Sequence, residues 1–371
     1  MTDRPETMTG VTSAPQLETP RRSRFALPVA LLVVTLLLVT GTGLWLRGGR
    51  EPSASREIAH SPVSVADGSN PVQSAPPVVT GVFIEPGDGR APLLGEIAAA
   101  RKSIALEVYL VTDDVILRAL EDARRRGIDV RVILEEHPFG GDGRQDEIFV
   151  RLEQAGIAVR WGNPVFRFTH IKTLVVDSAV AIIMNQNITE SAFTSNRDFG
   201  VVTTQPEAVR TAAALFEADW ARGPEPDPLP LVVSPTNARA LLLEMIAGAR
   251  RSLEIYAEVL RDPELLAAIA AAEARGVTVR LIVSPSEEFA AERSALAAGG
   301  VDIRLASSLY IHAKVIVADG ERAFIGSQNL SATSLDQNRE LGIIVDDPVN
   351  LARVSRTFEL DFRSGMPEQQ P

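Results

Sequence analysis

The chain has 371 residues, 45% of them hydrophobic, so it has enough apolar material to bury the core of a large globular protein. Its formal net charge of −11 counts against nucleic acid as a partner, because proteins that hold DNA non-specifically usually present a basic face. It contains no cysteine, which excludes disulfide bonds and thiolate metal sites.

The first element in chain order is an uncharged apolar stretch at residues 25–45. Its roughly twenty residues are long enough to span the hydrocarbon core of a bilayer as a helix. Arginines flank both ends with a small excess before the stretch, so the positive-inside rule places residues 1–24 in the cytoplasm. The sequence therefore predicts a single-pass protein of the cell membrane, with most of the chain outside the cytoplasm. A cleaved signal peptide is the alternative.

Residues 46–79 are rich in proline and serine and show neither helical nor strand periodicity. They are predicted to form a flexible linker, and a random coil of this length has a typical reach of about 30 Å. The body that follows could then contact the bilayer surface or stand away from it.

From residue 80 onward the chain consists of two similar halves, which we place at residues 80–225 and 226–371. For example, residues 126–131 (RGIDVR) match residues 275–280 (RGVTVR). Each half has the size of an ordinary domain, and the repetition indicates one duplicated unit.

Each half is predicted to begin with the order β-α-β-α-β. In the first half, a helix is expected from an N-cap at Asp113 or Asp114 to Gly127, and the second half repeats this pattern from Asp262 to Gly276. The other elements expected in the first half are strands at 79–85, 103–111 and 128–134 and a helix at 92–100. Strands that alternate with helices predict an α/β fold with a mostly parallel or mixed sheet and helices on its faces.

An eight-residue pattern, His-x-Lys-x-x-x-x-Asp, then occurs once in each half, as His170, Lys172 and Asp177 and as His312, Lys314 and Asp319. The two copies use two of the chain's three lysines and two of its four histidines. A lysine ammonium is a compact point charge that suits a non-bridging phosphate oxygen in a cramped site. The sequence therefore predicts a phosphate site that is built twice.

Each motif is expected to lie in a hairpin. In the second half, residues 311–317 are predicted to form a strand with His312 and Lys314 on one face, because side chains two apart share a face. Asp319 is followed by glycine, which favours a two-residue turn. The returning strand would then place Ser327 or Asn329 opposite His312.

These residues resemble the phospholipase D superfamily, whose signature is H-x-K-x-x-x-x-D followed by a Gly-Ser or Gly-Gly pair and an asparagine. The resemblance covers roughly residues 80–363. The second copy matches fully, with Gly326, Ser327 and Asn329. The first copy has Met184 and Asn185 in place of Gly and Ser, and Met184 is expected to crowd the site. The family implies a bilobed α-β-α-β-α sandwich with its active site at a pseudo-twofold seam.

Phosphodiester cleavage needs a nucleophile, an acid for the leaving oxygen, and positive charge around the phosphate. The two histidines can divide the first two roles, and the residues alone do not decide between them. The resemblance implies that His170 is the nucleophile and His312 the general acid and then base. Lys172 and Lys314 would stabilise the phosphate.

The remaining candidate residues occupy equivalent positions in the two halves. Asn185, Asn187, Ser327 and Asn329 are the candidate substrate-binding residues. Asp198 and Glu340 resemble the carboxylates that orient the histidines. Asp177 and Asp319 are interpreted as structural. No cofactor is expected, and no metal, because no cluster has the ligand spacing of a zinc site.

The sequence and the resemblance together suggest a membrane-anchored phosphodiesterase that acts on glycerophospholipids through a phosphohistidine intermediate. The phosphatidyl group would pass to water or to an alcohol, and no oligomer is required. Three alternatives stay open: a cardiolipin synthase-like transferase, a nuclease of the same superfamily, and a catalytically silent binding module.

Overall fold

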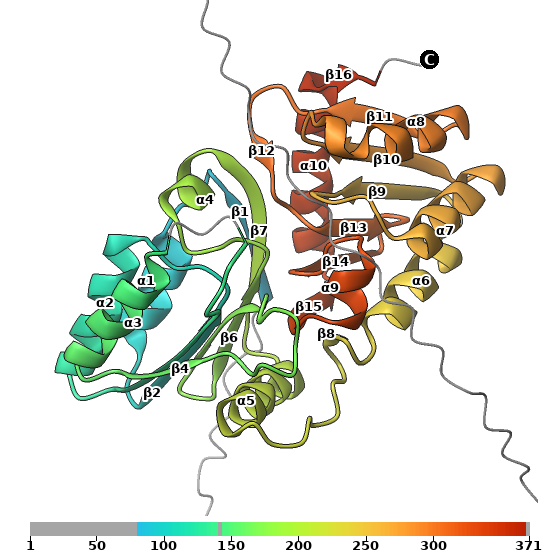
Figure 1. Ribbon diagram of the computed structural model, residues 1–371. Helices are drawn as coiled ribbons and strands as arrows, with labels where there is room; N and C mark the ends of the chain where they lie inside the picture. The colour runs from blue at the N-terminus through green and yellow to red at the C-terminus, as the bar shows by residue number, and fades with distance from the viewer. Residues whose placement is uncertain (1–79, 140–142, 369–371) are drawn as a thin grey trace, which may run out of the picture. The chain divides into compact units, whose positions relative to one another are not determined.

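The computed structural model describes residues 80–139 and 143–368 (Figure 1). The first half is built on an eight-stranded sheet in the order β1-β7-β6-β5-β2-β3-β4, and β12 from the second half pairs with β7. Its strands are β1 (Thr80–Glu85), β2 (Ser103–Val108), β3 (Asp129–Leu134), β4 (Ala158–Trp161), β5 (Lys172–Val176), β6 (Val180–Met184), β7 (Asn196–Thr203) and β12 (Tyr310–Ile311).

The second half has its own eight-stranded sheet, in the order β16-β11-β10-β9-β13-β14-β15-β8. Its strands are β8 (Val232–Ser234), β9 (Ser252–Tyr256), β10 (Thr278–Val283), β11 (Asp302–Leu305), β13 (Val315–Ala318), β14 (Arg322–Gly326), β15 (Glu340–Val345) and β16 (Met366–Pro367).

Apart from β12 and β16, which have no counterpart, the two sheets have the same strand order once each strand is replaced by its counterpart in the other half. Strands β2, β3 and β4 are parallel neighbours, as are β9, β10 and β11. Strands β5, β6 and β7 pair antiparallel, as do β13, β14 and β15. The prediction of a duplicated α/β unit with mixed sheets is therefore confirmed.

Helices cover the sheets in the positions that the repeat requires. They are α1 (Ala91–Ala99), α2 (Asp114–Arg125), α3 (Gln145–Gln154), α4 (Glu190–Thr194), α5 (Pro206–Ala221), α6 (Ala238–Gly248), α7 (Pro263–Ala274), α8 (Ala290–Ala298), α9 (Ala332–Asp336) and α10 (Pro348–Ser364), with a 3₁₀ turn at Glu287–Phe289 before α8. Of these, the sequence analysis expected α1 and α2 and their counterparts α6 and α7. The other helices were not expected, nor were the strands β4 and β11 that follow α3 and α8.

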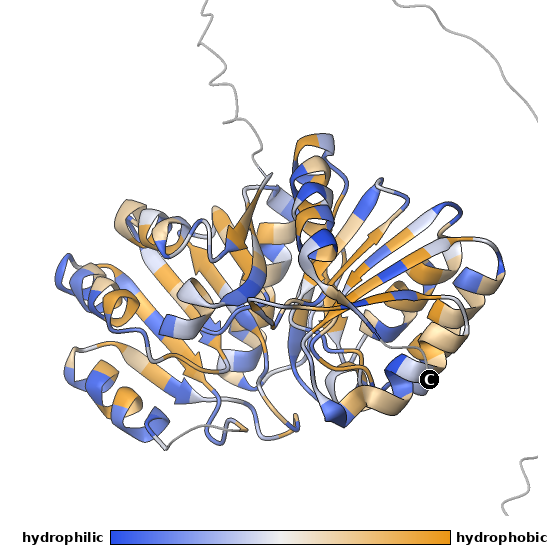
Figure 2. Ribbon diagram, turned by 90° about the horizontal axis from the view of Figure 1, so that it is seen from above, coloured by the Kyte–Doolittle hydropathy of each residue, from blue (hydrophilic) through white to orange (hydrophobic). Residues whose placement is uncertain are grey.

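Three hydrophobic clusters define the layers. One cluster packs α1 to α4 on the first sheet, and another packs α6 to α9 on the second. A third joins the facing surfaces of the two sheets and takes in residues of α5 and α10. Figure 2 shows the hydrophobic residues concentrated along the strands and on the inward faces of the helices. This is the α-β-α-β-α arrangement that the family resemblance implied.

The helix ends that the sequence indicated are present. Asp113 caps α2 by accepting hydrogen bonds from two backbone N–H groups, and Asp262 caps α7 by accepting one. Gly127 and Gly276 follow these helices with φ of 91° and 89°, a conformation that favours glycine.

The motif hairpin differs from its prediction. Asp319 and Gly320 form the predicted two-residue turn, with positive φ at both and a hydrogen bond from the N–H of Glu321 to the carbonyl of Ala318 at 3.0 Å. The ladder between β13 and β14, however, pairs Ala318 with Arg322, so Glu321 is an additional residue. The additional residue moves the register by one, and Gly326 donates its backbone N–H to the carbonyl of Lys314 at 3.4 Å. Neither Ser327 nor Asn329 is the residue that the register brings opposite His312. His312 itself precedes the strand.

The two halves exchange backbone segments at their seam. Strand β12, which ends just before His312, pairs with β7 of the first half. In return, Thr169, just before His170, forms a bridge with Arg339 of the second half. The described residues form one compact unit, so these crossings lie inside a single body.

Two reciprocal ion pairs, one buried and one partly buried, reinforce the seam. Arg197 of the first half binds both carboxylate oxygens of Asp361 at 2.7 and 2.9 Å. Arg339 of the second half binds both oxygens of Asp219 at 2.7 and 2.8 Å. Bidentate geometry of this kind holds the guanidinium in one orientation, so both arginines fix how the halves meet.

The leader at 1–24, the transmembrane helix predicted at 25–45 and the linker predicted at 46–79 lie outside the described residues. Among the residues that the structure does describe, no helix combines the length and the apolar character needed to span a bilayer.

Candidate active site

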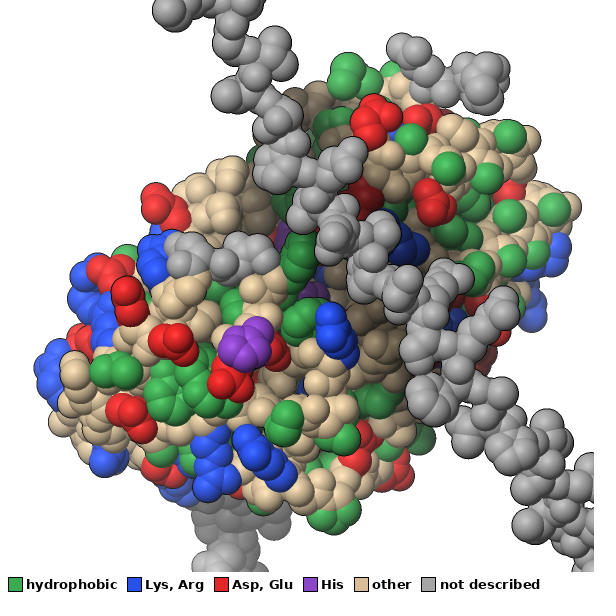
Figure 3. All heavy atoms as spheres, in the orientation of Figure 1, with side chains coloured by type: hydrophobic (Ala, Val, Ile, Leu, Met, Phe, Trp, Pro, Cys, Tyr) green, Lys and Arg blue, Asp and Glu red, His purple; other side chains and the backbone are tan. Residues whose placement is uncertain are grey.

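The two motif histidines are placed by backbone contacts with the opposite half. The N–H of His170 donates to the carbonyl of Arg339 at 2.9 Å, and the N–H of His312 donates to the carbonyl of Arg197 at 3.3 Å. Each histidine therefore enters the seam directly after a segment that crosses between the halves. In Figure 3, histidine side chains show within the hollow between the two halves.

Each imidazole is bound by a carboxylate from the other half. His170 Nδ1 lies 2.7 Å from Glu340 Oε2, and His312 Nδ1 lies 2.8 Å from Asp198 Oδ1. Both carboxylates are fully buried. The sequence placed Asp198 and Glu340 among the orienting residues, but only the fold shows that the two halves exchange them.

The Glu340 carboxylate is itself held in place. Its Oε1 accepts hydrogen bonds from Ser334 Oγ at 2.5 Å and from Asn338 Nδ2 at 3.0 Å. Burial by itself would raise the pKa of Glu340, but its contacts with His170 and the charge of Lys172 hold the pKa below its ordinary value. Glu340 is therefore an anion, and it can only accept a hydrogen bond from the N–H at His170 Nδ1.

His170 is in the form that a nucleophile requires. Burial lowers the pKa of His170 to about 4, so the ring is neutral at pH 7. Because Nδ1 carries the proton and donates a hydrogen bond to Glu340, the lone pair is on Nε2. This nitrogen is free to attack phosphorus.

Two ammonium groups lie beside the histidines. Lys172 Nζ donates to the carbonyl of His170 at 2.6 Å, and Lys314 Nζ donates to the carbonyl of His312 at 2.5 Å. Both side chains are almost fully buried. Burial lowers the pKa of Lys172 to about 7, and a bound phosphate anion would favour its charged form.

The sequence analysis missed a third carboxylate, Glu258, in the loop after β9. Its Oε2 lies 2.6 Å from Lys314 Nζ and 3.8 Å from His312 Nε2. Tyr310 donates its hydroxyl to Oε1 of Glu258 at 3.0 Å. The equivalent position in the first half is Tyr109, whose ring stacks edge-on against His170 at 4.5 Å. Alignment of the two halves could have shown this difference, but not its proximity to the motif.

Of the four candidate substrate-binding residues, two have a buried amide oxygen without a hydrogen-bond partner among the described residues, and two bind backbone groups. The amide oxygens of Asn187 and Asn329 are buried without a hydrogen-bond partner among the described residues, at equivalent positions of the two halves. Asn185 instead binds backbone, donating to the carbonyls of Lys314 and Gly326 and accepting from the N–H of Phe199.

Ser327 also binds backbone, exchanging hydrogen bonds with the N–H and carbonyl of Leu341. Like Asn185, it is fully buried. These contacts place Asn185 and Ser327 in the joint between strands, and their contact with a substrate stays a prediction.

Met184 does not crowd the site. Its side chain belongs to the cluster under α1 to α4, on the far side of the first sheet from the seam. At the equivalent Gly326, an added Cβ would meet Phe324 Cζ at 2.7 Å and the Cα of Gly342 at 2.6 Å. The counterpart of Phe324 in the first half is the smaller Ile182, which leaves room for methionine there.

The motif aspartates bind backbone away from the histidines. Asp177 accepts hydrogen bonds from the N–H groups of residues 101–103, and Asp319 accepts them from those of residues 250–252. These contacts tie each motif turn to the start of β2 or β9. They are the contacts of structural residues.

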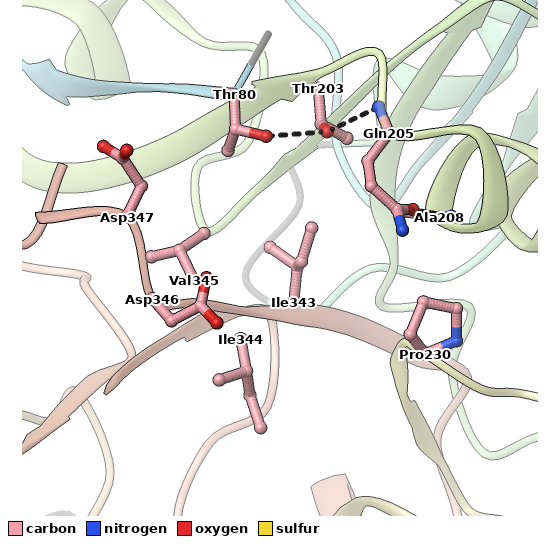
Figure 4. Close-up of a pocket in the computed structure, with 10 residues that line it drawn as sticks. All are labelled: Thr80, Thr203, Gln205, Ala208, Pro230, Ile343, Ile344, Val345, Asp346 and Asp347. Carbon is pink, nitrogen blue, oxygen red and sulfur yellow. Dashed lines mark hydrogen bonds between the residues drawn. The ribbon is translucent and has the colours of Figure 1, made fainter. Parts of the chain in front are cut away.

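The structure has a pocket away from the two histidine motifs. A pocket at the ends of β1, β7 and β15, lined by residues such as Thr80, Gln205 and Asp346, includes no motif residue (Figure 4). Within residues 80–139 and 143–368, no group of three or more His, Asp or Glu side chains is arranged to hold a metal ion.

Comparison with known protein families shows to which family the chain belongs. A family model described as "Cardiolipin synthase, PLD-like domain" matches residues 93–220 and again residues 242–362, once in each half. The chain belongs to the phospholipase D superfamily. The two matches contain both histidines, both lysines and both orienting carboxylates.

Relatives within the phospholipase D superfamily include a cardiolipin synthase of Geobacillus kaustophilus. It is 28% identical over 346 residues, which cover 80% of this chain and 68% of the relative. Cardiolipin synthase B of Salmonella typhi is 26% identical over 338 residues, covering 76% of this chain and 78% of the relative.

Solved structures of two proteins share the fold. The phosphatidylserine synthase of Haemophilus influenzae superposes with a TM-score of 0.64 at 14% identity, covering 78% of this chain and 88% of that one. The polyphosphate kinase of Porphyromonas gingivalis superposes with a TM-score of 0.61 at 20% identity, covering 76% of this chain and 47% of that one. At these identities the likeness concerns the fold alone.

Proposed function

We propose that this protein is a phosphatidyltransferase of the phospholipase D superfamily that cleaves glycerophospholipids through a phosphohistidine intermediate. The observation that supports this most directly is the crossed pair of histidine–carboxylate contacts, which brings two imidazoles and two ammonium groups into one hollow. The similarity to cardiolipin synthases supports a phospholipid as the substrate and an alcohol as the acceptor. Water is the competing acceptor, and its reaction is hydrolysis.

The charges around the two histidines support different roles. Glu340 is the carboxylate bound to His170, and burial, with a smaller contribution from both lysines, lowers the pKa of this ring, which keeps Nε2 unprotonated. His312 faces two carboxylates, with Nδ1 at 2.8 Å from Asp198 and Nε2 at 3.8 Å from Glu258, so it lies in the more negatively charged part of the site. His170 is therefore the proposed nucleophile and His312 the proposed acid.

In the first step, His170 Nε2 attacks phosphorus, the P–N bond forms and the bond from phosphorus to the headgroup oxygen breaks. His312 Nε2 gives its proton to that oxygen, so a neutral alcohol leaves. In the second step, His312 takes the proton of the incoming alcohol or water, whose oxygen attacks phosphorus and breaks the P–N bond. Lys172, Lys314 and the side chains of Asn187 and Asn329 stabilise the phosphoryl oxygens.

The test uses the purified chain with vesicles that contain a phospholipid labelled in its phosphatidyl group. Rapid quenching without acid, followed by peptide mapping, should place the label on the peptide that contains His170. Replacing either His170 or His312 by asparagine should abolish turnover. His137→Asn is the matched control, because His137 is exposed on a loop, and it should keep full activity. Label on the His312 peptide would reverse the two roles, and turnover in either motif variant would refute the shared site.

We further propose that residues 25–45 anchor the protein in the cell membrane and that the halves at 80–225 and 226–371 lie outside the cytoplasm. The flanking arginines support this orientation. Protease added to intact spheroplasts should digest the chain beyond residue 47 and spare a tag placed before residue 8. Protection of the chain beyond residue 47 would reverse the orientation.

A further inference from the structure

Exposed apolar side chains lie around the entrance to the two motif histidines. In the first half, Phe139 is 88% exposed and Val165 is 74% exposed. In the second half, Tyr310 is 50% exposed, and its ring centroid lies 6.4 Å from that of His312. Figure 3 looks onto the hollow and shows hydrophobic side chains beside the histidines. A single exposed apolar residue is common on a protein surface, but several around one opening mark a contact surface.

Hydrogen bonds place Phe139 at this entrance. Its N–H donates to the hydroxyl of Tyr109, whose ring packs edge-on against His170 with 4.5 Å between the ring centroids. The same loop is tied to the residue before His170, because the N–H of Thr169 donates to Glu135 Oε2 at 2.6 Å. Phe139 is therefore held beside His170 with its own side chain exposed.

Val165 lies in the turn formed by residues 162–169, directly before the first motif. The N–H of Val165 donates to the side chain of Asn163 at 3.2 Å. Arg167 donates its N–H to the carbonyl of Gln337 in the second half at 2.8 Å. These contacts hold the turn at the seam and leave the Val165 side chain exposed.

The second half has no equivalent of this turn. Eight residues, 162–169, separate β4 from His170, whereas six residues, 306–311, separate β11 from His312. The longer segment carries the apolar run Pro-Val-Phe at 164–166. Because the second half builds the same fold without the two additional residues, the fold itself does not require an exposed valine here.

One cation accompanies the apolar side chains. Arg167 is exposed, and its guanidinium lies 5.2 Å from the centroid of the Phe168 ring. Among the described residues, Arg167 forms no ion pair with a carboxylate. An arginine that lies against apolar surface and keeps its charged head in water suits the boundary between lipid chains and headgroups. Its guanidinium can bind a headgroup phosphate through two parallel hydrogen bonds.

A lipid surface is the partner that fits this combination. Apolar side chains with a basic group beside them bind at the interface of a bilayer, where the apolar tips leave water and the cation meets anionic headgroups. A phospholipid must also bring its phosphate to the histidines while its chains stay in an apolar medium. An apolar rim against the bilayer allows both.

The predicted linker is long enough for this contact. Strand β7 begins beside the entrance, where Asp198 binds the second motif histidine, and ends at Thr203, which pairs with Thr80. A strand of eight residues spans about 26 Å. Because a random coil of the length of residues 46–79 has a typical reach of about 30 Å, the entrance can meet the bilayer from which that linker would start.

We propose that Phe139, Val165 and Tyr310 form a membrane-docking rim, with Arg167 bound to a headgroup phosphate beside it, so that lipids reach the histidines without leaving the bilayer. The inference rests on the proposed phospholipid substrate and adds the surface through which the protein meets that substrate.

The first test compares two forms of substrate. The full chain in vesicles is given either a labelled long-chain phospholipid within the same bilayer or a short-chain phospholipid dissolved as monomers. Val165→Asp should lower the rate on the bilayer substrate by about tenfold, the effect of keeping one side chain of this size out of an apolar medium, and should leave the rate on monomers unchanged. A purely structural role for Val165 would lower both rates together.

Val349→Asp is the matched control. Val349 is 78% exposed near the start of α10, at the other end of β15 from Glu340. It offers the same residue type and nearly the same exposure, but far from the entrance. Both rates should stay unchanged in this variant.

The second test does not depend on catalysis. Because the chain contains no cysteine, a single introduced cysteine carries a single fluorescent probe. In full chain reconstituted into vesicles with doxyl-labelled lipids, a probe at Val165→Cys should be quenched. A probe at Val349→Cys should keep its fluorescence.

The outcomes separate this inference from the proposed function. Equal losses on both substrates in a folded Val165→Asp protein, an unquenched probe at position 165, or equal quenching at position 349 would each overturn the docking rim while leaving phosphatidyl transfer intact. If Val165→Asp does not fold, Phe139→Asp is measured in the same way and decides the kinetic test. If the wild-type protein turns over neither substrate, the proposed function fails, and the probe at position 165 still decides whether the rim meets the bilayer.

Discussion

Replacing Glu340 by glutamine should reduce activity far more than replacing Asp198 by asparagine, although each change removes the charge that faces a histidine Nδ1. The difference lies in the second oxygen of each carboxylate. Glu340 Oε1 accepts hydrogen bonds from Ser334 and Asn338. Asp198 Oδ2 is buried without a hydrogen-bond partner among the described residues.

In Glu340→Gln, the new carbonyl oxygen stays with Ser334 and Asn338, because the Asn338 amide donates there and would clash with a second donor. The new amide nitrogen then faces His170 Nδ1 and donates to it. The imidazole proton moves to Nε2, and the lone pair that attacks phosphorus is lost. In Asp198→Asn, the amide nitrogen can occupy the Oδ2 position instead, so the oxygen stays on His312 and the tautomer is kept.

We expect Glu340→Gln to lower kcat/KM by about 10³- to 10⁴-fold, the range found when a histidine is forced into the wrong tautomer. This corresponds to about 4–5.5 kcal/mol of transition-state stabilisation. Asp198→Asn removes the negative charge but keeps the tautomer of His312, and we expect it to lower kcat/KM by about 10- to 100-fold.

The assay measures initial rates of phosphatidyl transfer over a range of lipid concentrations, with circular dichroism to establish that both variants fold. Covalent labelling of His170 should disappear in Glu340→Gln and persist in Asp198→Asn. Equal losses in the two variants, or a larger loss in Asp198→Asn, would refute the reasoning from the second oxygen.

Two further predictions concern pH and stability. Because the pKa of His170 is about 4 and that of Lys172 about 7, kcat/KM should fall as pH drops through 4, where the nucleophile is protonated, and as pH rises through 7, where the ammonium is lost. Lys172→Arg keeps its charge and should lose the alkaline limb, even at a lower overall rate; an alkaline limb that persists would assign it to another group. Arg339→Met leaves Asp219 buried without its partner and should lower the free energy of unfolding in urea by about 3–5 kcal/mol. Removal of the exposed Arg118, which pairs with a carboxylate one helical turn away, should cost less than about 0.5 kcal/mol, and similar losses in both variants would contradict the burial argument.

Much of the fold followed from local patterns in the sequence. The caps at Asp113 and Asp262 and the glycines that end α2 and α7 depend on a few neighbouring residues, so the sequence reveals them without knowledge of packing. The hairpin after Lys314 was predicted in the right place and with the right two-residue turn, but Glu321 adds one residue before the ladder resumes, and this shifts the register.

The residues of the two motifs were identified from the sequence, but the arrangement around the site was not. Both histidines and both lysines were identified, since a spacing that occurs twice needs no structure to be recognised. Asn185 was expected to face a substrate, but its amide is used between the halves. Met184 was expected to crowd the site, and instead it lies in the core on the other face of its strand. Strand periodicity tells which residues share a face but not which face meets the seam.

By itself, the sequence determined that this protein is a duplicated unit, which residues form the two motifs, and that carboxylates follow them at equal distances. The tertiary structure alone decided that Glu340 binds His170 and Asp198 binds His312, and that Glu258 joins Lys314. The reason is physical. A motif is a relation between neighbours along the chain, whereas these contacts join residues from opposite halves, and only the packing of the two sheets at their seam brings those residues together.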